Sequence, residues 1–260
     1  TQAGPPHVIF MSLPKCIELA LHDGTDPRTG KKLGPATGKF EDFHSFDEFL
    51  EAFKKQVQHF SEESGRIRNL ERLVRVATAP TLFSSCLVDD CIKRGKCVLA
   101  DGPRWTFPAQ TPVGIIDAVD SLAAIKKCVF EEGSVAKAEL LPALAANFKG
   151  KEDVRRTLLS APKYGNDDDY VDSIAADLYE WWQGMVSQID GPYGAKHRPM
   201  PYSISSHGAA GKRVGALPSG RLSGMSLADG SVSPCQGSDV TGPTAVLNSA
   251  GKINQLPLLG

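Results

Sequence analysis

Three adjacent aspartates, Asp167, Asp168 and Asp169, raise the question of a metal site, because carboxylates are common ligands of divalent cations. A calcium loop alternates its ligands with spacers and carries a glycine at the turn, whereas contiguous carboxylates diverge. From Val171 to Ile189 the apolar residues recur at the spacing of an amphipathic helix. Acidic residues at the start of a helix cap free N–H groups and favour the positive end of the helix dipole. We therefore predict a capped helix start and no metal site, with metal ligation as the alternative.

The cysteines form no zinc pattern. No C-x-x-C pair occurs, and no histidines stand at ligand spacing. In a chain of this length they suit reduced, buried thiols better than a disulfide framework. Cys97 follows a helical run and Cys235 lies in a loop, so these two are the more accessible candidates for reactivity, although a structural role is favoured. The six cysteines are Cys16, Cys86, Cys91, Cys97, Cys128 and Cys235.

Four polar residues in the C-terminal part of the chain are further candidates. His207, in the sequence S-S-H-G, has a side chain that titrates near neutral pH and suits general acid or base chemistry. A histidine beside small residues is more often simply hydrogen-bonded in place, and this alternative is favoured. Asp229, Gln236 and Asp239 lie among Gly and Ser, where short polar side chains bond local N–H groups. We expect these three to organise loop backbone.

Composition excludes several classes of protein. The chain has 260 residues and a formal net charge of −1, with charges of both signs interspersed. No basic face indicates a nucleic-acid partner, and no acidic tail indicates a charged one. No apolar run approaches the ~18 residues of a membrane span, and the first ten residues lack the features of a signal peptide. The sequence therefore predicts a cytoplasmic protein without membrane contact, of one large or two ordinary domains.

Hydrophobic periodicity predicts that residues 1–190 are mostly helical. A capping box formed by Ser45 and Glu48 opens one apolar stripe. Residues 24–43 are rich in Gly, Pro, Thr and Asp and predict successive turns. The expected helices span residues 11–21, 46–60, 67–78, 82–94, 113–132, 137–148, 153–160 and 171–189.

Residues 191–260 differ in character, since Gly, Ser and Pro dominate there. Short β-prone pieces occur at residues 202–206 and 213–216. Gly and Pro at 242 and 243 open a last expected helix at residues 244–252. Glycines interleaved with single Arg, His, Asp and Gln residues favour ordered loops in which the backbone approaches another group closely. Composition alone also allows a flexible linker.

Five stretches together carry a family resemblance. They are "KCIELALHDGTDPRTGKKLGPATG", "DSLAAIKKCVFEE", "APKYGNDDDYVD", "SSHGAAGKRVGALPSGRLSG" and "LADGSVSPCQGSDVTGPTAVLNSAGKI". In this order and spacing they resemble the glycyl radical enzymes, the pyruvate formate-lyase-like family. That family includes diol dehydratases, arylacetate decarboxylases, C–S and C–N lyases and alkylsuccinate synthases. The resemblance covers nearly the whole chain.

The resemblance implies an α/β fold, a ten-stranded barrel of two half-sheets wrapped by helices. Two loops meet inside such a barrel, one with a cysteine that becomes a thiyl radical and one with a glycine that stores the radical. A separate S-adenosylmethionine-dependent activating enzyme installs the glycyl radical, and no dissociable cofactor is needed. The implied protein is oxygen-sensitive, acts in anaerobic metabolism on a small-molecule substrate, and is a homodimer at full length.

The chain departs from the family pattern at its two ends. The cysteine loop is expected just before Thr1 and the glycine loop well beyond Gly260, so residues 1–260 resemble an incomplete domain without a catalytic residue. The implied function is that of a fragment of an enzyme that cleaves or eliminates a C–C, C–O, C–N or C–S bond, or transfers an acyl group. By itself the fragment is expected to be inactive. The alternative is a split or degenerate family member that acts as a scaffold or subunit.

Residues 100–112 correspond to a family segment that shapes the substrate pocket. Within it Arg104, Trp105, Thr106 and Phe107 offer a cation, two aromatic walls and a hydroxyl, a mixture that suits a mostly apolar site. The alternative is a surface arginine beside core aromatics. We expect these four residues and His207 to bind substrate, with Trp105 favouring an aryl or apolar one. The resemblance further places Asp229, Gln236 and Asp239 as support near the radical loop.

Overall fold

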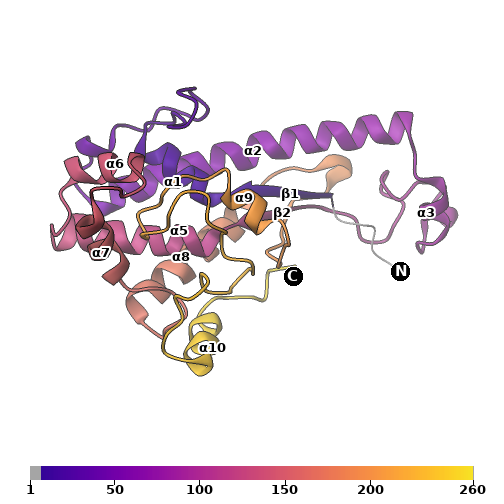
Figure 1. The fold of residues 1–260 in the computed structure, drawn as a ribbon. Helices are drawn as coiled ribbons and strands as arrows, with labels where there is room; N and C mark the ends of the chain where they lie inside the picture. The colour runs from indigo at the N-terminus through magenta and orange to yellow at the C-terminus, as the bar shows by residue number, and fades with distance from the viewer. Residues whose placement is uncertain (1–6, 260) are drawn as a thin grey trace.

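A small parallel sheet lies at the middle of the molecule (Figure 1). The computed structural model describes residues 7–259, so the expectations made for the first six residues lie outside it. Strand β2 (Pro108–Val113) pairs in parallel with β1 (His7–Ser12) and with the short β3 (Arg198–Pro199), in the order β1-β2-β3. The predicted helix at residues 11–21 begins later, as α1 (Leu13–Leu21), because Met11 and Ser12 end strand β1.

Four helices enclose the main core. These are α1, α2 (Phe46–Thr78), α5 (Ile115–Ala124) and α8 (Asp169–Val186). Every residue of α5 is buried, because this helix packs against both α1 and α8. The apolar stripes that predicted these helices supply the core side chains, among them Phe49, Phe53 and Trp182.

The remaining helices are short. They are η1 (Phe40–Asp42), α3 (Leu82–Cys86), α4 (Cys91–Arg94), η2 (Ile125–Glu131), α6 (Lys137–Ala145), α7 (Glu152–Ser160), η3 (Pro192–Gly194), α9 (His207–Gly211) and α10 (Pro243–Gly251). The predicted helix at 113–132 is therefore α5 followed by η2, a π-helix, and the one at 82–94 is two short helices. Residues 202–206 and 213–216 do not form the expected strands. No described helix is both long and apolar enough to cross a membrane.

Helix α2 is a single helix of 33 residues, so the prediction of two separate helices at 46–60 and 67–78 was wrong. Its predicted cap is confirmed, since the Ser45 Oγ accepts a hydrogen bond from the Glu48 N–H at 3.3 Å. The polar junction between the two predicted helices contains no proline and continues the helix. At this junction Gly65 lacks a side chain, and this lets the helix approach Ile189 and His197 closely.

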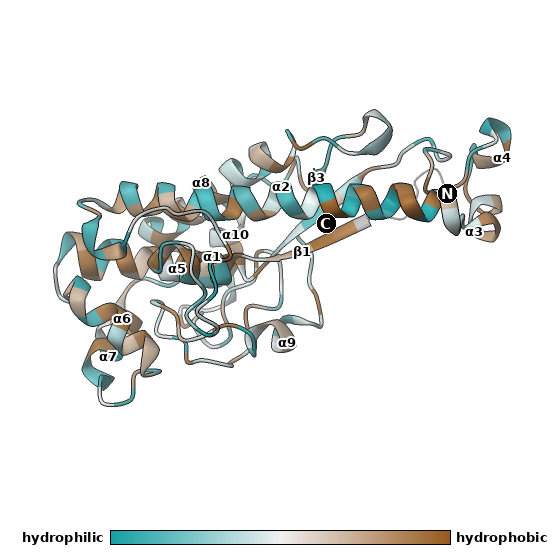
Figure 2. Cartoon of the chain, turned by 90° about the horizontal axis from the view of Figure 1, so that it is seen from above, coloured by the Kyte–Doolittle hydropathy of each residue, from teal (hydrophilic) through white to brown (hydrophobic). Residues whose placement is uncertain are grey.

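The far half of α2 presents its apolar residues to solvent. Ile67 is 70% exposed and Leu70 63%, whereas Arg72 on the opposite face is only 1% exposed. Figure 2 shows the resulting brown bands along the part of α2 nearest α3. The periodicity predicted the helix correctly but indicated the wrong inward face, because the segment that covers Arg72 comes from residues 97–106.

Candidate functional site

Four of the five family-like stretches meet around one cavity of about 580 Å³. We call it the Asp–Cys cavity after Asp117, Asp120 and Cys235, which lie in its wall. The acids come from α5, and the other walls come from α7 and from loops between residues 161 and 241. The other lining residues are Arg155, Leu159, Ala161, Pro162, Lys163, Asn166, Asp168, Ser219, Gly220, Arg221, Met225, Ser226, Gln236, Gly237, Ser238, Val240 and Thr241.

Asp117 lies in the first turn of α5 and is only 2% exposed. Its Oδ2 accepts a hydrogen bond from the Ala228 N–H at 2.8 Å, and its Oδ1 lies 3.9 Å from the Arg221 Nε. Burial raises the pKa of the Asp117 carboxyl to about 6, although Ala228 and Arg221 both favour the charged form. The group can therefore exchange a proton close to neutral pH.

Asp120 follows three residues later on the same face of α5 and is 1% exposed. Its Oδ1 accepts from the Tyr164 N–H at 2.9 Å. Burial raises the pKa of Asp120 to about 7, partly opposed by that hydrogen bond and by the cation of Lys163. Two carboxyls that titrate near neutrality thus share one wall of the cavity, an arrangement that can donate and accept protons.

Cys235 lies in the loop that faces the two acids. Burial first, and then the Asp117 and Asp120 carboxyls, raise the pKa of the Cys235 thiol well above its usual range. The sulfur therefore keeps its proton at neutral pH and is a poor nucleophile and metal ligand. Within residues 7–259, no group of three or more His, Cys, Asp and Glu side chains is placed to hold a metal ion.

Two cations of the cavity also hold its walls together. Arg221 donates to the carbonyls of Gly215 and Gly211, at 2.9 and 3.0 Å. Lys163 Nζ donates to the carbonyls of Leu158 and Ala161, at 3.0 and 2.8 Å. Burial lowers the pKa of both side chains. The cavity is thus a preorganised polar site whose charged groups are fixed by loop backbone.

Sequence reasoning named Asp168 of this cavity, as part of the acidic triplet, but not the two acids of α5 or the cations Arg155, Lys163 and Arg221. A signal was present, since Asp117 and Asp120 interrupt an otherwise apolar helix at a spacing that places them on one face. Two charged residues on a fully buried helix need hydrogen-bond or ion-pair partners, and only the folded structure shows which residues these are.

The predicted substrate residues in the 100–112 segment lie elsewhere. Arg104 is exposed and its guanidinium lies 5.9 Å from the centre of the Trp105 ring, which is itself 58% exposed. The Thr106 Oγ1 accepts a hydrogen bond of 2.6 Å from the Nη2 of Arg72. Phe107 is half-buried immediately before β2. None of these four side chains lines the Asp–Cys cavity.

The other predicted residues lie in or near the loops around that cavity. His207 begins α9, and its Nδ1 lies 2.8 Å from the Ile204 carbonyl. The backbone carbonyl of Asp229 accepts from the Ile204 N–H at 3.1 Å. Gln236 lines the cavity and its Nε2 donates to the Leu227 carbonyl at 3.4 Å. The fourth residue, Asp239, lies beside Gly165.

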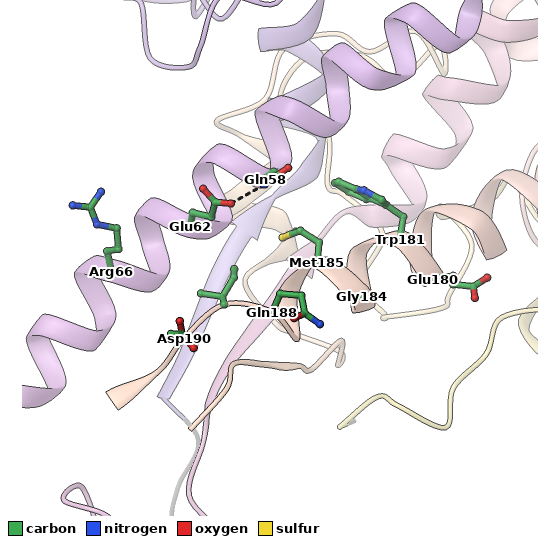
Figure 3. Close-up of a pocket in the computed structure, with 10 residues that line it drawn as sticks. Gln58, Glu62, Arg66, Glu180, Trp181, Gly184, Met185, Gln188 and Asp190 are labelled. Atoms are coloured by element: carbon green, nitrogen blue, oxygen red, sulfur yellow. Dashed lines mark hydrogen bonds between the residues drawn. The ribbon is translucent and has the colours of Figure 1, made fainter. Parts of the chain in front are cut away.

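A second, open groove of about 760 Å³ runs between α2 and α8 (Figure 3). Gln58 and Glu62 line it from α2 and are hydrogen-bonded to each other at 2.8 Å. Trp181 and Met185 line it from α8. Its polar residues are the flexible side chains of a helix surface, so the groove is a weaker candidate for chemistry than the Asp–Cys cavity.

Comparison with known proteins decides the family. The family model described as pyruvate formate lyase-like matches residues 4–211. The chain belongs to the pyruvate formate lyase-like family of glycyl radical enzymes. It is 35% identical to trans-4-hydroxy-L-proline dehydratase of Clostridioides difficile, over 95% of this chain and 31% of the relative. It is also 35% identical to isethionate sulfite-lyase of Oleidesulfovibrio alaskensis, over 92% of this chain and 29% of that enzyme.

Solved structures of the family agree with the α/β fold. The glycerol-bound, B12-independent glycerol dehydratase of Clostridium butyricum superimposes with a TM-score of 0.90 and 36% identity, over 97% of this chain and 33% of that one. Hydroxyproline dehydratase of Clostridioides difficile, with its substrate bound, gives a TM-score of 0.92 and 34% identity, over 96% of this chain and 32% of that one. The chain therefore spans about a third of the length of these family members.

Proposed function

We propose that this chain is a segment of a glycyl radical dehydratase or lyase that eliminates a group from a small organic substrate. The observation that carries the proposal is the similarity over almost the whole chain to enzymes named for such reactions, including glycerol and hydroxyproline dehydratases. Several of these relatives are named dehydratases, for the elimination of water, and others are named sulfite-lyases.

The radical in this proposal is carried outside residues 1–260. The family resemblance assigns it to a cysteine before the chain and to a glycine after it. The glycyl radical is installed by a separate S-adenosylmethionine-dependent activating enzyme, with no dissociable cofactor, in a cytoplasmic homodimer. The 260 residues alone are then inactive.

The Asp–Cys cavity contributes a fixed polar environment to this enzyme. Asp117 and Asp120 each hold a distant loop by accepting a backbone hydrogen bond, and their raised pKa values keep a proton available near neutral pH. Arg104, Trp105, Thr106 and Phe107 are proposed to contact substrate from a second direction, with His207, while Asp229, Gln236 and Asp239 support the loops.

Electron paramagnetic resonance tests the proposal. The 260-residue chain and a longer polypeptide that includes the flanking coding sequence are each incubated anaerobically with a family activating enzyme, S-adenosylmethionine and a reductant. We expect a glycyl doublet and turnover of a small diol or hydroxylated acid from the longer polypeptide only. A doublet from the 260-residue chain would contradict its inactivity. No doublet from the longer one would favour the scaffold or subunit alternative.

A further inference from the structure

Arg72 is a buried cation without a carboxylate partner in the described part of the chain. Its side chain is 1% exposed, yet no Asp or Glu of residues 7–259 lies within ion-pair distance of it. Asp101, which like Tyr193 raises the Arg72 pKa against the effect of burial, forms an ion pair with Arg94 at 2.8 Å. A buried, uncompensated charge is costly, so proteins normally pair it.

The guanidinium is only partly satisfied by hydrogen bonds. Its Nε donates to the Leu99 carbonyl at 2.8 Å, and its Nη2 donates to the Thr106 Oγ1 at 2.6 Å. The third nitrogen, Nη1, is buried and has no partner. A guanidinium carries five N–H donors, so Nη1 and the second hydrogen of Nη2 remain as a free two-pronged edge.

The residues around this edge of the guanidinium resemble those of a closed ligand-binding site. The Tyr193 ring lies over the guanidinium at 5.8 Å, and Tyr193 itself is 45% exposed. Its backbone has φ +61°, in the left-handed region that a tyrosine rarely adopts and that often marks ligand clamps. Thr106 is half-buried, and its hydroxyl hydrogen is free to donate because its oxygen already accepts from Arg72.

We propose that Arg72 and Thr106 form a binding site for the carboxylate of a small organic acid. The two oxygens of a carboxylate match the free edge formed by Nη1 and Nη2, and the Thr106 hydroxyl donates to one of them. The half-exposed Tyr193 ring lies 5.8 Å from the guanidinium, so binding of the acid requires this side chain to move. The site does not depend on radical chemistry and is present in the 260-residue chain.

Calorimetric titration of the 260-residue chain with sodium propionate tests the site. Propionamide, which has the same shape without the charge, and sodium chloride at equal ionic strength serve as ligand controls. We expect saturable binding of propionate only. We expect propionate to bind at least tenfold more tightly than propionamide, because the amide lacks the negative charge and replaces one acceptor oxygen by an NH2 donor.

Three variants locate the binding. Arg72→Met should abolish it and still fold, because an apolar side chain replaces an unpaired buried charge. Thr106→Val should weaken propionate binding about tenfold and also lower the melting temperature, because the Nη2 of Arg72 loses its acceptor. Arg75 lies about one turn further along the same helix and is half-exposed. The control variant Arg75→Met should bind propionate as the unaltered chain does.

Several outcomes would overturn the proposal. One is equal response to propionate and chloride. Another is unchanged propionate binding by both Thr106→Val and Arg72→Met. If the longer polypeptide binds no propionate although the 260-residue chain does, a carboxylate of the protein itself occupies the site and the assignment to a free acid fails.

Discussion

Lys252, just after the last helix, lies with its Nζ 2.9 Å from the Oδ2 of Asp172, a carboxylate that is fully buried in the first turn of α8. The same ammonium contacts Asp169 at 2.7 Å and Asp167 at 2.9 Å. Hydrogen bonds first to Asp169, then to Asp172 and Asp167, raise the pKa of Lys252. The acidic cluster, for which metal ligation was the alternative to helix capping, therefore surrounds a lysine, and through it α10 is attached to α8.

Removing this lysine should loosen the C-terminal helix. Among residues 7–259, Lys252→Met leaves the side chain of the buried Asp172 with the Ser249 hydroxyl as its one remaining partner, at 2.9 Å. An under-satisfied buried acceptor costs about 1–3 kcal/mol, so we expect a lower melting temperature and faster amide hydrogen exchange in residues 243–251. Lys252→Arg is the control and should retain most of the stability. Unchanged exchange in α10 for the Met variant would show that the ion cluster does not hold the helix.

The cap of α8 is Asp168, one of the three aspartates that were expected to open this helix. Its side chain accepts from the Tyr170 N–H at 2.9 Å, whereas Asp167 has a left-handed backbone with φ +57° and faces Lys252. Asp168→Ala should therefore lower the free energy of unfolding by about 1 kcal/mol, and Asp168→Asn should cost much less. Chemical denaturation measures both values. Equal losses for Ala and Asn would exclude the capping role.

Calcium should leave the melting temperature unchanged, because the Lys252 ammonium already occupies the space between the three carboxylates. Thermal unfolding with micromolar to millimolar calcium, with magnesium for comparison, checks this. Stabilisation that saturates at micromolar calcium would favour metal ligation after all.

Features of the fold that depend on local interactions were predictable from local sequence patterns. The Ser45 cap and the apolar stripe after it identified the start of α2, because helix capping and amphipathicity are encoded within a few residues. The inward burial of Arg72 was not predictable in this way. It depends on the Leu99 carbonyl and the Thr106 hydroxyl, which lie 27 and 34 residues away in sequence.

The same limit applies to the Asp–Cys cavity. Asp117 accepts from a residue 111 positions away, and Asp120 from one 44 positions away. Four of the five stretches that carry the family resemblance meet there, but the resemblance did not identify the residues that join them. The segment containing Arg104 and Trp105 remains a predicted substrate site. Its side chains lie outside this cavity.

Stability should respond to pH through Asp120. Burial raises its pKa from an ordinary value of 3.8 to about 7, so the folded protein binds a proton that the unfolded chain releases between about pH 4 and pH 7. The contribution of this group therefore becomes less favourable as pH rises through that range. In Asp120→Asn this contribution disappears, while the amide oxygen can still accept from the Tyr164 N–H.

Calorimetry of both proteins from pH 5 to pH 8 isolates this effect. The difference in melting temperature, variant minus unaltered protein, should become more positive as pH rises. The buried His197, whose pKa is lowered by burial to about 4, acts in the opposite direction in both proteins and cancels in the difference. Asp177→Asn on the exposed face of α8 should show no such trend. A pH-independent difference for Asp120→Asn would mean that this carboxyl is ionised throughout.

Substitution of the exposed Trp105 tests whether this side chain lines a substrate site or has a structural role. At 58% exposure it contributes little to the core of this chain, so Trp105→Ala should leave the melting temperature of the 260-residue protein almost unchanged. If it lines the substrate site of the proposed longer enzyme, the same change should preserve the radical yield and lower kcat/KM about ten- to a hundredfold, a loss of about 1–3 kcal/mol in transition-state binding. Bulkier substrates should lose least, because the variant site is larger.

Arg104→Ala separates substrate classes, since an anionic substrate loses a charge-assisted contact and a neutral one does not. A joint fall in soluble yield and radical content, with substrate ranking unchanged, would instead assign the segment a structural role.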